Sequence, residues 1–210
     1  GALIAVAPDL DHGVIGVNGM NYSTLLRRSS DFDTYAQFLY NAYPDELERP
    51  VLLQLLQMLW DRAEADGYAQ HMTTDPYPNT PRHKVLMHIG FGDHQVSNYA
   101  AKVEARTVGA HAFAPWTDAG RDTDRHPLFG LPAIRGASFG GSAIVMWDSG
   151  SPPPPKEELP PREGEDPHEF PRRSPLGQRQ KSDFLRPGGR ITDVCGAHPC
   201  YANGYKNSPK

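Results

Sequence analysis

The sequence predicts an α/β fold built on a parallel β-sheet that carries a helical insert. Three short apolar runs, at residues 12–20, 84–91 and 141–148, have the composition of buried strands. Helical patterns separate these runs, and strands that alternate with helices imply parallel crossover connections. The run 84–91 is almost continuously apolar, which is typical of a strand that a parallel sheet buries on both faces.

The chain begins with a short helical pattern and then a strand. Residues 1–8 are mostly small and apolar and stop at Pro8, as expected for the end of a closely packed helix. The run 12–20 is bounded by glycines, which suits a short buried strand.

A helical insert is predicted at residues 20–83. Aromatic residues fall on one helical face over 32–43, and 44–67 has the clearest helical pattern of the chain. Acidic residues cluster at the start of 44–67 and Gly67 follows its end, which are helix start and stop signals. These faces either contact an apolar ligand or pack within the protein, and we expect 68–83 to be a loop. The leucines at helical spacing are Leu52, Leu55, Leu56 and Leu59.

The order of elements continues after the second strand. Residues 97–109 predict a helix, with Ser97 as its N-cap and Gly109 as its stop. We expect 111–116 to be part of a loop and 141–148 to be the third strand. Three strands alone would leave an unpaired edge that needs partners.

The composition changes after the third strand. We assign 1–150 to the core with its insert, 151–186 to a proline-rich loop and final helix that complete the core, and 187–210 to a C-terminal tail. The chain holds 21 prolines, roughly twice the average share. Regular structure cannot run far through such a segment, so the final short helix is expected at 174–186.

Charge and hydropathy exclude some classes of partner. The formal net charge is −4 and no basic stripe is present, so nucleic acid is not an expected partner. No apolar run reaches the ~18 residues of a membrane span.

The chain has two cysteines, Cys195 and Cys200, in the stretch CGAHPC. We expect a disulfide that closes a small loop, which favours a secreted or periplasmic location. Two free thiols are the alternative. A zinc site would need more ligands than this pair and His198 supply.

Asp93 is the candidate catalytic carboxylate. It follows the apolar run of the middle strand, and catalytic groups of open α/β sheets gather beyond the carboxyl ends of the strands. Gly90 and Gly92 permit a tight turn that brings the carboxylate back across the sheet end. The alternative is a loop carboxylate that caps the helix starting near Ser97.

The stretch VLMHIGFGDHQV, placed between a helical insert and a helix, resembles the C-terminal half of an α/β-hydrolase. In that fold the catalytic triad runs serine, acid, histidine along the chain. The resemblance implies that Asp93 is the acid and that the histidine follows the last strand. It also implies that residues 20–83 are a lid-like insert and that residues 1–8 follow the nucleophile elbow, so that the serine lies upstream, in a missing N-terminal half of the same protein.

Two histidines follow the last strand. His168 lies in a long loop just before the final helix, where such a base usually sits, and is favoured. His198 lies between the two cysteines and remains the alternative. His94 is expected at the rim of the site, and His88 is expected to be a core imidazole of the middle strand.

One match to the G-x-S-x-G pattern occurs at GASFG, with Ser138 at its centre. A nucleophile elbow needs a strand before the serine and a helix after it, whereas an apolar β-type run follows Ser138. Ser138 also comes after Asp93, against the hydrolase order, so it is not expected to be the nucleophile.

The predicted function is that of the C-terminal part of a serine hydrolase for a small-molecule ester or amide, which needs no cofactor. We expect the chain alone to fold poorly and to be inactive. The alternative is a non-catalytic, hydrolase-like module that binds a partner through the segment SPPPPKEELPP. A metal site formed by Asp166, His168 and Glu169 is a weaker third possibility.

Overall fold

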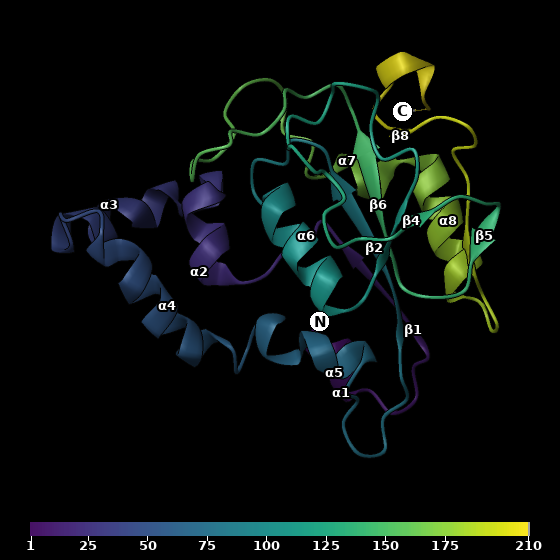
Figure 1. Cartoon of the computed structure of the whole chain (residues 1–210), viewed down its shortest axis with the longest axis horizontal. Helices are drawn as coiled ribbons and strands as arrows, with labels where there is room; N and C mark the ends of the chain where they lie inside the picture. The colour runs from purple at the N-terminus through teal and green to yellow at the C-terminus, as the bar shows by residue number, and fades with distance from the viewer. Residues whose placement is uncertain (210) are drawn as a thin grey trace.

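A computed structural model describes residues 1–209 and shows a mixed α/β fold around a six-stranded sheet (Figure 1). The strand order is β1-β2-β6-β3-β4, and β8 also pairs with β6. Every pairing in this sheet is parallel. The strands are β1 (His12–Gly16), β2 (Lys84–Gly90), β3 (His111–Phe113), β4 (Ala133–Ile134), β6 (Ala143–Asp148) and β8 (Cys200–Tyr201).

Helices cover both faces of this sheet (Figure 1). One face packs against α1 (Ala2–Val6), α5 (Ala69–Thr73) and α6 (Asn98–Thr107). The other face packs against α7 (Phe170–Arg173) and α8 (Pro175–Leu185). The α6 helix begins as predicted, because the Ser97 side chain accepts a hydrogen bond from the backbone N–H of Ala100.

The side chains of the middle strand β2 pack on both faces of the sheet, which explains its continuous apolar run. Val85, Met87 and Ile89 point to the α1, α5 and α6 side, while Leu86 joins the cluster on the α8 side. This alternation buries both faces of the strand, as the sequence predicts. The cluster on the α8 side is centred on Trp147 and Phe184, both almost fully buried.

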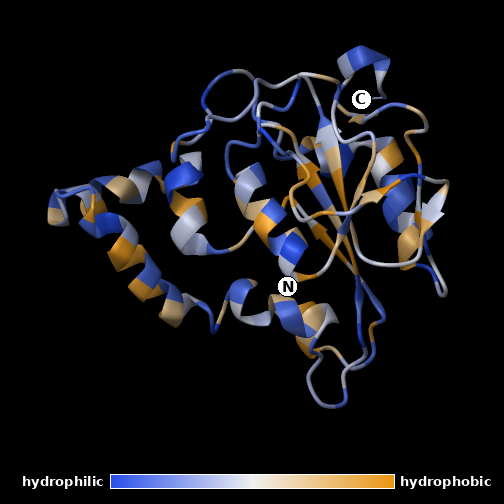
Figure 2. Ribbon diagram, in the orientation of Figure 1, coloured by the Kyte–Doolittle hydropathy of each residue, from blue (hydrophilic) through white to orange (hydrophobic). Residues whose placement is uncertain are grey.

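The insert contributes the short helix α2 (Tyr22–Leu25) and the longer helices α3 (Asp33–Ala42) and α4 (Glu48–Trp60), which project away from the sheet (Figure 1). The short 3₁₀ turns η1 (Leu26–Arg28) and η2 (Ser30–Phe32) lie between α2 and α3, and η3 (Asp66–Tyr68) lies between α4 and α5. Figure 2 shows hydrophobic residues along α4, and much of this face is exposed to solvent. The exposed apolar residues of the two long helices are Tyr35, Phe38, Val51, Leu55, Met58 and Leu59.

Three sequence-based expectations are wrong. Residues 68–83, expected as a loop, contain α5, and 111–116 contain β3. The tail, 187–210, supplies β8 to the sheet and also β7 (Ile191–Thr192), which pairs with β5 (Ser138–Phe139) in a separate antiparallel sheet; the tail ends with the turn η4 (Tyr205–Asn207). Strands of two or three residues and a five-residue helix are too short for a periodic pattern. The additional strands all lie beyond β6, so within residues 1–209 the outer edge of β1 has no partner.

No helix within residues 1–209 combines the length and the apolar character needed to cross a membrane.

Cys195 and Cys200 form the expected disulfide, and their Cα atoms are 5.2 Å apart. The bond joins the loop after β7 to the start of β8, so it restrains the edge strand that completes this end of β6. Within the part of the chain that the structure describes, neither cysteine is free.

Replacing both cysteines with serine should lower the free energy of unfolding by about 2 kcal/mol, because the cross-link restricts a short loop in the unfolded chain. Urea denaturation of the protein and of this double variant measures the difference. Reductant should reproduce the loss in the parent protein and leave the variant unchanged; equal stability in all samples would contradict the structural role.

Candidate active site

Asp93 lies in the turn after β2 and is 2% exposed. Its Oδ1 accepts hydrogen bonds from the backbone N–H groups of Gln95 and Val96, each at 2.9 Å. The helix that follows is capped by Ser97 and not by Asp93. Asp93 therefore shapes its own turn, and its second oxygen is left for another partner.

Asn98, at the first position of α6, stabilises the same turn through two side-chain hydrogen bonds. Its side-chain amide donates to the carbonyl of Gly90 at 2.6 Å and accepts from the N–H of Gly92 at 2.8 Å. Gly92 has a φ of +77°, which favours glycine, so the predicted tight turn is present. The sequence analysis missed Asn98, although an asparagine directly after an N-cap serine and near two glycines is a signal of turn bonding.

The two glycines also let the proline-rich loop reach the end of β2. A Cβ on Gly90 would lie 3.0 Å from the carbonyl oxygen of Pro167, and one on Gly92 would lie 2.5 Å from that of Pro152. A larger residue at either place would push this loop away. The close approach sets the position of His168, the residue after Pro167.

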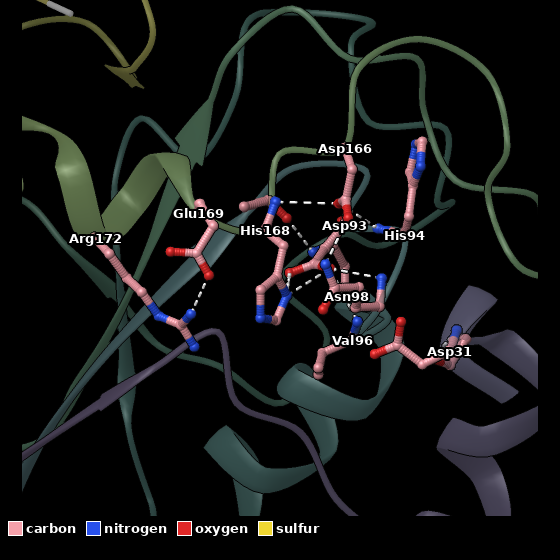
Figure 3. Close-up of polar contacts among 12 residues, drawn as sticks. Asp31, Asp93, His94, Val96, Asn98, Asp166, His168, Glu169 and Arg172 are labelled. Atoms are coloured by element: carbon pink, nitrogen blue, oxygen red, sulfur yellow. Dashed lines mark hydrogen bonds and ion pairs between the residues drawn. The ribbon is translucent and has the colours of Figure 1, made fainter.

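The imidazole of His168 meets the carboxylate of Asp93 (Figure 3). Its Nδ1 lies 3.1 Å from both Asp93 oxygens, across 75 positions of sequence. The structure thus brings together the two residues that the sequence analysis proposed as acid and base. Within residues 1–209, Nε2 of His168 has no hydrogen-bond partner, and the side chain is 12% exposed.

Asp166 ties the two loops together (Figure 3). Its Oδ1 accepts from the backbone N–H of His94 at 3.2 Å and of His168 at 3.1 Å. Its Oδ2 accepts from the side chain of Gln95 at 2.8 Å. The sequence analysis considered Asp166 only as a metal ligand, whereas the structure gives it this bridging position.

The electrostatics of the pair favour a charged imidazole. Burial alone would lower the pKa of His168, but the hydrogen bond and the negative charge of Asp93 outweigh it and raise the pKa above its usual value. Burial likewise opposes ionisation of Asp166. The hydrogen bonds from Gln95 and from the N–H groups of His94 and His168 outweigh that effect and lower the pKa of Asp166.

The other candidate base lies elsewhere. His198 stacks on Tyr201, with ring centroids 5.3 Å apart, and its Nδ1 lies 2.9 Å from the carbonyl oxygen of Pro199. It makes no contact with Asp93.

Two further histidines lie near the middle strand. His94 is almost buried, and Figure 3 shows its imidazole turned away from Asp93. His88 is the expected core imidazole: its Nε2 lies 2.7 Å from Gln180 Oε1, and burial lowers its pKa to about 3. Neither residue reaches the Asp93–His168 pair.

Ser138 lies on the exposed strand β5, where its hydroxyl accepts a hydrogen bond from Arg190 Nε at 3.1 Å. The strand-to-helix turn of a nucleophile elbow is therefore absent at this serine, as expected. The three residues considered as a metal site, Asp166, His168 and Glu169, do not converge. Glu169 pairs with Arg172 and not with His168 (Figure 3). Among residues 1–209, one group of three carboxylates could hold a metal ion, and it lies in the insert.

A cavity of about 620 Å³ lies between the end of β1 and the insert. Gln95 and Val96, whose N–H groups bind Asp93, form part of its wall. The apolar part of the wall includes Val17, Tyr22, Leu25, Leu26 and Phe32. The cavity therefore borders the turn that carries the acid.

No protein-family model, curated protein or solved structure matches this chain.

The imidazole of His168 should titrate above pH 6.5 in the parent protein and below 6.5 in Asp93→Asn. Burial opposes the charged form, and the carboxylate that outweighs it is lost in the variant. NMR titration of the imidazole measures both midpoints. The pair stabilises the fold below the unfolded-state pKa of about 6.5 and loses that contribution as pH rises through the folded-state pKa. An unchanged midpoint in the variant would mean that Asp93 does not control this imidazole.

Proposed function

We propose that this chain supplies the acid and base of a serine hydrolase of the α/β type. Asp93 is the acid, His168 is the base, and the nucleophilic serine lies upstream of the chain. The substrate is a small-molecule ester or amide, and no cofactor is required.

One observation carries the proposal: a buried carboxylate holds Nδ1 of an imidazole at 3.1 Å while Nε2 has no partner within residues 1–209. A triad needs this asymmetry, because the acid fixes the tautomer through Nδ1–H and leaves Nε2 to take the proton of the nucleophile. The pair lies at the carboxyl end of a parallel strand, where α/β enzymes place their catalytic groups.

The arrangement of elements gives further support. The acid follows β2 and the base follows β6, its neighbour in the sheet, so the order along the chain is that of the hydrolase fold. The unpaired edge of β1 offers a place for an additional parallel strand. In the hydrolase fold, the strand that carries the nucleophile would occupy this side of the sheet.

The mechanism follows from these positions. Nε2 of His168 removes the proton of the serine hydroxyl as its oxygen attacks the substrate carbonyl carbon. The imidazolium, stabilised by Asp93, gives that proton to the leaving alcohol or amine, and the C–O or C–N bond breaks. Water then attacks the acyl-enzyme with the same proton transfers through His168. The serine oxygen leaves, and the carboxylic acid product is released. The apolar wall of the cavity beside Asp93 suits the acyl part of such a substrate.

The alternative is a non-catalytic module whose proline-rich segment binds a partner. The exposure of Pro153, Pro155 and Leu159 supports it. Ion pairs hold this segment to the insert, with Arg28–Glu158 at 2.8 Å and Arg162–Asp33 at 2.7 Å. A partner would therefore meet only one face of the segment, and the free Nε2 of His168 would have no role.

In the protein that carries the upstream half, Asp93→Asn should lower kcat by about 10⁴-fold, because the imidazole loses the carboxylate that fixes its tautomer and stabilises its charge. His168→Ala should lower kcat by about 10⁶-fold, because the base itself is lost. The measurement is ester hydrolysis under saturating substrate. His198→Ala is the matched control and should retain near-parental turnover. Turnover close to parental in Asp93→Asn or His168→Ala would remove that residue from the triad.

A fluorophosphonate should label a serine upstream of Gly1, because the reagent reacts with a hydroxyl that a histidine activates. The serine oxygen bonds to phosphorus as fluoride leaves. Mass spectrometry of the labelled peptides locates the adduct, and His168→Ala should abolish it. Labelling at Ser138, or labelling that persists in the histidine variant, would contradict the proposal.

A further inference from the structure

A second group of carboxylates lies where the insert returns to the core. Asp61 follows α4, Asp66 begins η3, and Glu64 lies between them. Each can place one oxygen within 4.8 Å of the other two. The chain turns tightly here, since a Cβ on Gly67 would collide with the carbonyl oxygen of Asp61.

Glu64 shows that this group is incomplete. Its side chain is buried at 8% exposure, and its Oε1 accepts hydrogen bonds from the backbone N–H of Tyr22 and from the side chain of Gln57. Its Oε2 is buried and has no partner among the described residues. A buried carboxylate oxygen without a donor is costly, and therefore points to a missing positive ligand.

The protein supplies no positive side chain to these carboxylates. Across residues 1–209, no Lys, Arg or His forms an ion pair with Asp61, Glu64 or Asp66. The one basic residue inside the turn, Arg62, is exposed. Three carboxylates are thus held together with no compensating charge from a side chain of residues 1–209.

We propose that Asp61, Glu64 and Asp66 bind one Ca²⁺ ion. Hard cations take oxygen ligands, and Ca²⁺ binds them at about 2.3–2.6 Å, so two ligands of one ion lie at most roughly 5 Å apart. The three oxygens all lie within 4.8 Å of one another, which meets this condition without movement of the chain. Mg²⁺ demands near-ideal octahedral geometry and usually keeps several waters, whereas Ca²⁺ accepts the irregular geometry that carboxylates of one short turn offer.

The ion would fix the base of the insert. Glu64 accepts from the N–H of Tyr22 at 3.2 Å, and Gln57 Oε1 accepts from the N–H of Ser23 at 2.9 Å. Both donors belong to the segment that leaves β1, so the two ends of the insert meet at the calcium site. Glu64 and Tyr22 also line the cavity beside Asp93. Calcium therefore sets the shape of one cavity wall, and this inference stands independently of the proposed hydrolase chemistry.

Terbium luminescence tests the site directly. Tb³⁺ replaces Ca²⁺ on oxygen ligands and is excited through a nearby indole, and Trp60 directly precedes Asp61. Excitation of tryptophan in the purified protein should give Tb³⁺ emission, which Ca²⁺ should suppress by competition. The triple variant Asp61→Asn, Glu64→Gln and Asp66→Asn should lose at least nine-tenths of the emission. Glu163→Gln, an exposed carboxylate elsewhere, is the matched control and should keep it.

Thermal unfolding supplies the second measurement. Ca²⁺ at about a hundred times its Kd should raise the Tm of the parent by roughly 5–10 °C and leave the triple variant unchanged. In EDTA the triple variant should be at least as stable as the parent, because its neutral side chains lack the repulsion among the three carboxylates. Equal Tb³⁺ emission from the triple variant, or no Tm change of the parent with either Ca²⁺ or Mg²⁺, would overturn the site. A Tm rise with Mg²⁺ but not with Ca²⁺ would overturn the choice of ion.

Discussion

The arrangement of the site depends on the bridge that Asp166 makes between two loops from distant parts of the chain. Its carboxylate accepts backbone hydrogen bonds from both His94 and His168, so the turn after β2 and the loop after β6 share one anchor. This anchor holds the two loops together beside the contact between Asp93 and His168. The close approach that Gly90 permits to Pro167 adds a steric constraint to the same junction.

At this junction the fold restricts the partners that the carboxylate of Asp93 can bind. The Oδ1 of Asp93 is engaged by two backbone N–H groups, and Asn98 holds the glycine turn beneath it. The position of the carboxylate is therefore set by two backbone N–H groups of its own turn and by the side-chain amide of Asn98. Glu64 presents the opposite case, because one oxygen of this buried carboxylate has no donor within residues 1–209.

Continuous apolar runs predicted the parallel core, because they locate β2 and β6. The pairing of Asp93 with His168 was predicted only through the resemblance to α/β-hydrolases, since the residues alone left a loop carboxylate and His198 as alternatives. The sequence did not predict β3, β4 or β8, which are two or three residues long and gain their conformation from pairing with neighbours. Asp166 and Asn98 were missed as positioning residues because their partners are backbone groups, which sequence patterns do not reveal.

The insert leaves and rejoins the core at adjacent points, since Tyr22 and Ser23 bond to Glu64 and Gln57. A segment whose ends already touch can be lengthened, shortened or exchanged at little entropic cost to the rest of the molecule. The insert also reaches the junction, because the backbone N–H of Ser30 donates to the carbonyl of His94 at 2.8 Å. Length changes between α3 and α4, far from the sheet in Figure 1, would therefore act on an exchangeable tip, whereas changes near Ser30 would disturb the turn that carries Asp93.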